Sequence, residues 1–193
     1  RRILASFILV CGLCVVTQAE VQITTFVCDV TPLVNEPVGL GFIPITTTVE
    51  HPLLAKGIVV SDGDHRYVLC AIDWMEVHNS SYDLIRTTLA TAASTSVSHV
   101  AVHCLHQHTA PAIDSHAQRI HLDVNHVRRV STAKYLDKVT RQLSKAVTTS
   151  LESLQALTHI GTSQAKVDRV ASNRRLETAD GSIRRRLSSP KDE

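Results

Sequence analysis

The stretch Leu53–Ile72, with the sequence LLAKGIVVSDGDHRYVLCAI, decides the fold class of this chain. It holds two apolar runs, Leu53–Val60 and Arg66–Ile72, on either side of the turn signal Ser61-Asp62-Gly63-Asp64. An Asp-Gly pair between two runs of β-forming residues favours a tight turn, so this stretch predicts a β-hairpin. An earlier apolar run, Val21–Val30, predicts a strand before the hairpin.

Helical periodicity follows the hairpin. The apolar positions Leu84, Ile85, Leu89 and Ala92 predict a helix that is capped by Ser80 or Ser81 and reaches about Ala93. A clearer helix is predicted over 132–154, with its apolar residues on one face at Leu136, Val139, Leu143, Val147, Leu151 and Leu154. Runs at 97–102 and 157–170 predict strands, whereas 35–44 and 110–130 read as irregular. Strands that alternate with helices predict an α/β layered fold with a mixed β-sheet flanked by helices.

The two ends of the chain predict an exported protein with a domain larger than these 193 residues. Arg1 and Arg2 precede an uncharged run from Ile3 to Val16, and a small residue, Ala19, follows. This pattern predicts a signal peptide over 1–19, with a buried strand or a short anchor as the alternative. Residues 20–193 would then be the N-terminal portion of a larger catalytic domain, because the polar segment after Ala171 shows no sign of closing a core.

Charge and cysteine content argue against a nucleic-acid-binding protein and against a disulfide-rich protein. The chain has 20 basic and 18 acidic residues, so 20 − 2 = 18 basic residues remain without Arg1 and Arg2, and no nucleic-acid surface is indicated. Cys28, Cys70 and Cys104 lie in apolar runs. We expect them to be small buried hydrophobic residues, or to form at most one disulfide, rather than a disulfide framework.

Histidines gather in one region of the sequence, since seven of the eleven lie between His99 and His126. His106 and His108 come directly after a predicted buried strand. In an extended segment, residues two apart point to the same side, so both rings can face one pocket. Neutral imidazole binds metals such as zinc. The alternative is a pair of histidines that is only solvated or hydrogen-bonded.

Other polar residues lie near this pair in the sequence. Asp114 and His116 follow it closely, whereas His103 is expected to be a hydrogen-bonded core residue and His121 and His126 to lie on the surface. Asp29 and Asp73 each end an apolar run. Such an acid can cap a turn, support a histidine or bind a metal, and we favour the first two roles.

A series of short motifs gives the chain a resemblance to one family. In order, they are Asp29-Val30-Thr31-Pro32, Gly39-Leu40-Gly41-Phe42, 51–57 (HPLLAKG), Ala71-Ile72-Asp73, 106–111 (HQHTAP) and 165–175 (AKVDRVASNRR). The chain resembles the N-terminal domain of neutral/alkaline non-lysosomal ceramidases over roughly residues 24–187. The shared order of the motifs is more specific than any one of them.

The resemblance implies a zinc-dependent amidase. His106 matches a zinc ligand of the family, and His108 matches a histidine near the substrate. Asn173 and Arg174 match a pair that lines the substrate cleft, and Arg174 would hold a polar or anionic part of the substrate. Three departures, Leu105 and Gln107 for threonines and Ala110 for glycine, weaken the support around the metal and do not favour ceramide itself as substrate.

The sequence therefore predicts an exported zinc-dependent hydrolase that cleaves an amide (N-acyl) or related bond. Its substrate would be a small-molecule or lipid-like N-acyl compound, with association at a membrane surface left open. This segment alone is expected to be inactive, because one matched ligand cannot hold a catalytic zinc ion. The alternative is a degenerate or non-catalytic secreted module of the same fold that only binds.

Overall fold

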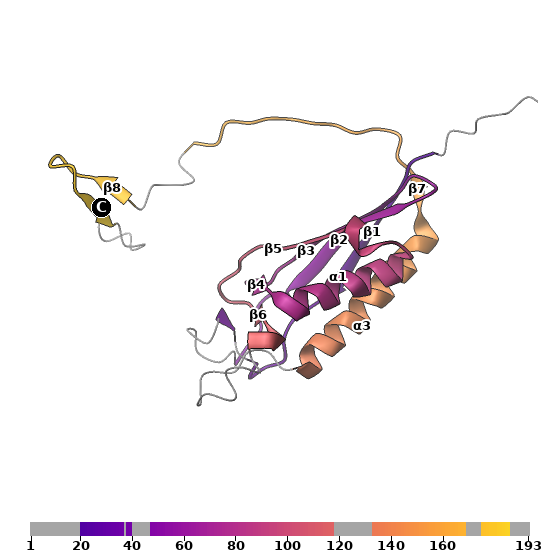
Figure 1. The fold of residues 1–193 in the computed structure, drawn as a ribbon, viewed down its shortest axis with the longest axis horizontal. Coiled ribbons are helices and arrows are strands. Elements are labelled where there is room, and N and C mark those ends of the chain that lie inside the picture. Colours follow the sequence, from indigo (N-terminus) through magenta and orange to yellow (C-terminus); the bar gives the residue numbers. More distant parts are fainter. Residues whose placement is uncertain (1–19, 37, 40–46, 118–132, 169–174, 186–193) are drawn as a thin grey trace, which may run out of the picture. The chain divides into compact units, whose positions relative to one another are not determined.

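The computed structural model describes residues 20–36, 38–39, 47–117, 133–168 and 175–185. The chain divides into two units, one up to Thr158 and one from His159. The first unit contains a five-stranded mixed sheet with helices, which confirms the predicted α/β layered fold (Figure 1). Its strand order is β5-β3-β2-β1-β7.

The predicted hairpin forms the centre of the sheet. β2 (Leu54–Ser61) and β3 (Arg66–Ile72) pair antiparallel across the Asp62-Gly63 turn, and β1 (Gln22–Asp29) pairs antiparallel with the other side of β2. β5 (Val100–Cys104) then joins β3 in parallel. The strand predicted from Val97 begins only at Val100, because Val97–His99 form a 3-10 turn that is capped by Ser96.

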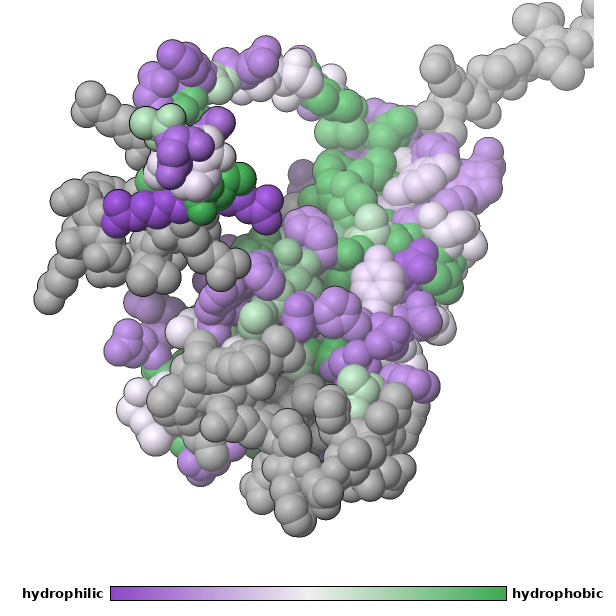
Figure 2. All heavy atoms as spheres, turned by 60° about the vertical axis from the view of Figure 1, so that its left-hand side comes forward, coloured by the Kyte–Doolittle hydropathy of each residue, from purple (hydrophilic) through white to green (hydrophobic). Residues whose placement is uncertain are grey.

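Two helices, α1 (Asn79–Ala93) and α3 (Ala133–Ser150), pack against each other and against the same face of the sheet (Figure 1). Buried side chains alternate along β1 at Thr24, Phe26 and Cys28, which face the helices. The opposite face carries exposed hydrophobic residues, including Val27 at 59% and Leu69 at 50% exposure. Figure 2 shows hydrophobic residues on the surface of the folded body beside hydrophilic ones.

The helix ends differ from the prediction. The N-cap of α1 is His78 instead of Ser80 or Ser81, and Ser81 is buried, where its hydroxyl bonds that of Ser115 at 2.8 Å. The helix α3 ends at Ser150, and Leu151–Ser153 continue as a 3-10 turn, so Leu151 and Leu154 are not part of its buried stripe. The other predicted positions of the stripe, Leu136, Val139, Leu143 and Val147, are buried.

Two further predictions about segments were wrong. The irregular region after Ala110 contains a short buried strand, β6 (Ala112–Ile113), which pairs with β4 (Glu76–Val77). The strand predicted over 157–170 is limited to β7 (Gln155–Ala156), and residues 157–168 form no strand. The N–H of Leu157 donates to the Val21 carbonyl at 2.7 Å, and Val21 precedes the first residue of β1, so beyond Leu157 the antiparallel partner strand has come to its start.

The second unit contains one small hairpin. β8 (Arg175–Glu177) and β9 (Ile183–Arg185) pair antiparallel, with Gly181 at a φ of 78° in the turn between them. Asp180 accepts hydrogen bonds from the Ser182 amide at 2.9 Å and from the Thr178 hydroxyl at 2.5 Å. The side chains of β8 are exposed, in agreement with the absence of a core pattern after Ala171.

Candidate functional site

The candidate site lies where β5 ends and its chain continues beside the chain that leaves β3. The N–H of Leu105 donates to the Ile72 carbonyl at 3.0 Å, and the N–H of His106 donates to the Trp74 carbonyl at 3.1 Å. His106 has a φ of 63°, a left-handed conformation that is uncommon for a residue with a side chain. The segment therefore turns at His106 and does not continue as the extended chain that the alternation argument assumed.

The structure nevertheless brings the two predicted histidines together, although the pocket at this end of the sheet is lined by Gln107 and Thr109 and by neither histidine. The rings of His106 and His108 are exposed, their centroids are 5.0 Å apart, and the ring planes meet at 87°. His106 Nδ1 lies 3.1 Å from the carbonyl oxygen of Met75. A carbonyl can only accept a hydrogen bond, so Nδ1 carries the hydrogen and Nε2 of a neutral ring keeps its lone pair. This arrangement is typical of histidines that bind a metal through Nε2.

A pocket of about 600 Å³ lies at this end of the sheet. Antiparallel pairing places the start of β2 beside the ends of β1 and β3, and parallel pairing adds the end of β5. Residues from all four positions line the pocket: Thr31, Pro32, Val38, Thr47, Thr48, Val49, Glu50, His51, Pro52, Leu53, Asp73, Gln107 and Thr109. The lining combines hydroxyl, amide, imidazole and carboxylate groups with an apolar part, and so suits an amphipathic small molecule.

The carboxylates of Asp29 and Asp73, at the ends of β1 and β3, each accept a hydrogen bond from a backbone N–H group. Asp73 Oδ2 accepts the N–H of Leu54 at 2.9 Å, and Asp29 Oδ1 accepts the N–H of Thr31 at 2.8 Å. Hydrogen bonds from the side chain and backbone of Thr31 hold the pKa of Asp29 below its usual range. The capping role therefore describes both acids, and Asp73 also lines the pocket.

Asp114 fixes the loop that follows the histidine pair. Its carboxylate accepts the N–H groups of His116 and Ala117 at 3.0 Å each and the side-chain amide of Asn79 at 2.7 Å. Burial alone would raise the pKa of Asp114, but the hydrogen bonds from Ala117, Asn79 and His116 lower it overall. Its lone pairs are therefore used to hold α1 and this loop together.

Five other residues that the sequence analysis singled out are either exposed on β5 or lie outside the described part of the chain. His103 is exposed, so its prediction as a core residue was wrong: it lies on the face of β5 that points away from the helices. His121, His126, Asn173 and Arg174 lie outside the described residues. The substrate-binding roles of Asn173 and Arg174 therefore stay predictions.

The cysteines behave as hydrophobic residues. Of the five cysteines, the three that lie among the described residues are free, with Cys28 and Cys70 buried and Cys104 half-buried. Burial raises the pKa of Cys28 and of Cys104 to about 11, and that of Cys70 to about 12. Burial therefore keeps these three thiols protonated near neutral pH in the metal-free chain.

The fit of this site to a zinc ion is partial. One imidazole nitrogen of His106 is oriented by a backbone carbonyl, and a second ring lies beside it. Within the described parts of the chain, no three or more His, Cys, Asp and Glu side chains are grouped so that they could hold a metal. Catalytic zinc sites normally use three protein ligands, so the pair supplies two candidate donors and not a complete site.

Reasoning from the sequence missed the contribution of His51 to the pocket. His51 is exposed and lies directly before β2, far in sequence from Gln107, yet both line the same pocket. The available signal was the hairpin itself, because an antiparallel strand must start beside the point where its neighbours end.

Comparison with known proteins supports the fold. No protein-family model and no curated protein matches the chain. Two solved structures, a neutral ceramidase from Pseudomonas aeruginosa and a ceramidase complexed with C2, are each similar with a TM-score of 0.54 and 14% sequence identity. Each match covers 72% of this chain, which spans only 22% of the length of the solved chain.

These values show a shared fold with part of the ceramidase structures.

Among the described helices, none has both the length and the apolar character needed to cross a membrane.

Proposed function

We propose that this chain carries part of the active site of an exported zinc-dependent hydrolase that cleaves an amide (N-acyl) or related bond. One observation carries the proposal. His106 is held through Nδ1 by the Met75 carbonyl, so Nε2 of the neutral ring carries the lone pair, and this ring lies beside that of His108. The similarity of the fold to neutral ceramidase supports the reaction class by analogy.

In this proposal, His106 binds the zinc ion through Nε2. When bound, zinc would polarise the substrate carbonyl and lower the pKa of a bound water or hydroxyl nucleophile. His108 positions the substrate or a proton, since its ring is 5.0 Å from that of His106. Asn173 and Arg174 hold a polar or anionic part of the substrate. The pocket beside Gln107 accepts a small-molecule or lipid-like N-acyl compound.

Hydrolysis of a series of N-acyl substrates tests this proposal. The whole protein that contains this segment is purified with and without added zinc, and release of the acyl chain is measured by mass spectrometry for the unaltered protein and for His106→Ala. We expect zinc-dependent hydrolysis that the substitution abolishes. Hydrolysis that is equal in both proteins would contradict the assignment of His106.

A second candidate function is a binding module without catalysis. The observation that favours it is the absence, within the described residues, of a third metal-binding side chain near the histidine pair. In that case the protein would bind an N-acyl compound in the pocket, with Glu50 and His51 as contacts, and would release no acyl chain. Calorimetric titration with the uncleaved compound, run beside the hydrolysis assay, separates the two functions.

Export is also a proposal, based on the basic start and the apolar run of residues 1–19. Secretion from a bacterial host and N-terminal sequencing of the secreted protein would test it. We expect a mature N-terminus near Glu20. Recovery only in the cytoplasm with Arg1 and Arg2 retained would contradict it.

A further inference from the structure

The backbone conformation of His106 requires support from outside its own loop. His106 lies in the left-handed region, with a φ of 63°, where the Cβ atom of an L-residue is crowded by the following carbonyl oxygen. The sequence between Cys104 and Pro111 contains no glycine, for which this conformation is unstrained. A strained conformation of this kind persists only where the surrounding structure holds it in place. The groups that hold His106 therefore also determine where its ring lies.

Two consecutive residues, Trp74 and Met75, provide this support through their backbone. The Trp74 carbonyl accepts the N–H of His106 at 3.1 Å, and the Met75 carbonyl lies 3.1 Å from Nδ1 of the His106 ring. The N–H of Met75 donates to the Pro111 carbonyl at 3.0 Å. Residues 74–75 therefore hold the backbone of His106, its ring and the far end of the loop 106–111.

The side chain of Trp74 anchors these two residues in the core. It is fully buried, and its Nε1 atom donates to the Tyr135 hydroxyl at 3.0 Å and to the Val30 carbonyl at 3.4 Å. The Tyr135 hydroxyl donates to the same carbonyl, and the Trp74 and Tyr135 ring centroids are 5.9 Å apart. The preceding residue, Asp73, exchanges two hydrogen bonds with Leu54, each of 2.9 Å. Trp74 is thus fixed both through its side chain and through the chain that leads to it.

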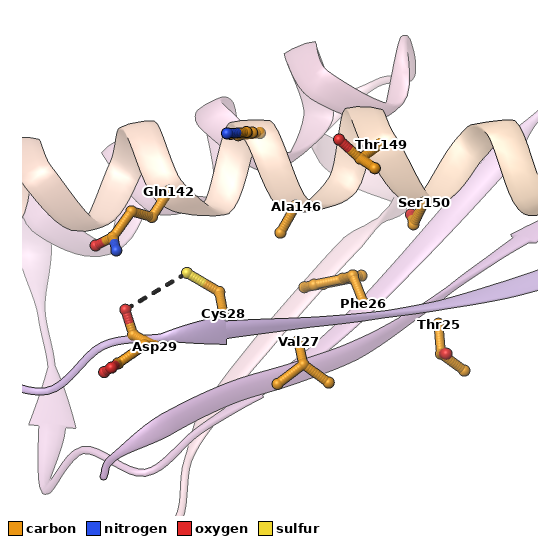
Figure 3. A pocket seen from close by; sticks show the side chains of 10 residues that line it. Thr25, Phe26, Val27, Cys28, Asp29, Gln142, Ala146, Thr149 and Ser150 are labelled. Atoms are coloured by element: carbon orange, nitrogen blue, oxygen red, sulfur yellow. Dashed lines mark hydrogen bonds between the residues drawn. The ribbon is translucent and has the colours of Figure 1, made fainter.

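The other end of this anchor is α3, which carries Tyr135 and is packed on β1. Figure 3 shows Phe26 and Cys28 of β1 pointing towards Ala146 of α3. The Val30 carbonyl, which accepts from both aromatic side chains, follows directly after β1. The anchor therefore joins three parts of the folded body: α3, the end of β1 and the chain that leaves β3.

We propose that Trp74 is a positioning residue for His106 and that Tyr135 of α3 completes its anchor. The proposal rests on the proposed function, in which His106 is the zinc ligand. Acting through the backbone of residues 74–75, the anchor keeps the hydrogen on Nδ1 of the neutral His106 ring and the lone pair on Nε2. Without it, the loop relaxes from the left-handed conformation, the bond to the Met75 carbonyl is lost, and the ring populates both tautomers.

A purely structural role of the two aromatic residues makes a different prediction. In that case, their substitution lowers the stability of the core and leaves the His106 ring unchanged. Val147→Ala provides the matched control, because Val147 is a fully buried residue of the same helix that lies about 18 Å along its axis from Tyr135. Its loss destabilises the core without touching the anchor.

Nitrogen NMR of isotope-labelled histidine, in the metal-free whole protein that contains this segment, reads the tautomer of the ring. The variants are Trp74→Phe, which keeps an aromatic ring and removes Nε1–H, and the more conservative Tyr135→Phe. His106→Ala assigns the signal. We expect the Nδ1–H tautomer in the unaltered protein and in Val147→Ala, and a mixture of tautomers in Trp74→Phe and, to a smaller extent, in Tyr135→Phe.

Zinc affinity, measured by calorimetry at a temperature where all these proteins are folded, is the second readout. We expect Trp74→Phe to bind zinc about tenfold more weakly than Val147→Ala, the lower end of the loss typical for groups that orient a metal ligand. An unchanged tautomer in Trp74→Phe and Tyr135→Phe, or an equal change in Val147→Ala, would overturn the proposal. Absence of zinc binding in the unaltered protein would instead refute the proposed function, and the tautomers of the metal-free protein would still decide the role of Trp74.

Discussion

Replacement of Gly57 by alanine tests the register of the sheet. Gly57 lies opposite Phe26 on β1 and faces the helices. A Cβ atom at this position would lie 2.5 Å from the Leu69 carbonyl oxygen and closer still to Cζ of the Phe26 ring. The oxygen belongs to β3 and is held within the sheet, so it cannot move aside as the end of a flexible side chain could.

The size of the effect follows from two opposing terms. Overpacking of a well-packed core costs about 1–3 kcal/mol. Alanine also restricts the unfolded chain, which offsets about 0.4–1 kcal/mol. We therefore expect Gly57→Ala to lower the free energy of unfolding by about 1–2 kcal/mol, which corresponds to a urea midpoint lower by about 0.5–1 M.

Urea unfolding followed by circular dichroism measures this change. Gly161→Ala is the matched control, because a Cβ atom at Gly161 has no neighbour within 4 Å and should leave the midpoint unchanged. A Gly57→Ala protein that unfolds at the same urea concentration as this control would refute the pairing of Phe26 with Gly57.

Three further predictions concern the core and the titrating groups. Tyr135→Phe should lower the free energy of unfolding by about 1–3 kcal/mol in urea titrations. The reason is that the Tyr135 hydroxyl accepts a hydrogen bond from Trp74 Nε1 at 3.0 Å and donates one to the buried Val30 carbonyl. An unchanged urea midpoint would contradict this. Iodoacetamide at neutral pH should label Cys28 and Cys70 slowly in the folded protein and rapidly in urea, because burial raises their pKa values to about 11 and about 12. Peptide mapping measures the two labelling rates. Equal rates in the folded and the unfolded protein would show that these thiols are accessible. The pKa of Asp114 is lowered in the folded protein, so the stability it adds is present above about pH 4 and is lost as the pH falls through the folded-state pKa. Thermal melts against pH should show this loss, and Asp114→Asn should remove it.

Local patterns in the sequence were sufficient for the central elements of the fold. The Asp-Gly turn and its flanking apolar runs predicted β2 and β3, and the 3.6-residue period predicted the buried face of α3 at Val139, Leu143 and Val147. β4 and β6 were missed because two-residue strands carry no period, and they exist only because Glu76 and Ala112 meet in space.

The candidate site was predictable in part. His106 and His108 were identified from their place after a strand, and the structure sets their rings side by side. The left-handed turn at His106 and its bond to the Met75 carbonyl depend on the chain that leaves β3, which no local pattern reveals. The contribution of His51 likewise depends on strand pairing between distant segments.

Zinc affinity of His106→Ala in the whole protein that contains this segment, measured by calorimetry beside His103→Ala, tests the central claim most directly. His103 is an exposed histidine of β5 whose loss should leave binding unchanged. Removal of a partner behind a ligand typically costs about 10- to 100-fold in metal affinity, so removal of the ligand itself should cost more than about 100-fold. Equal zinc affinity of the two variants would contradict the assignment of His106 as a zinc ligand.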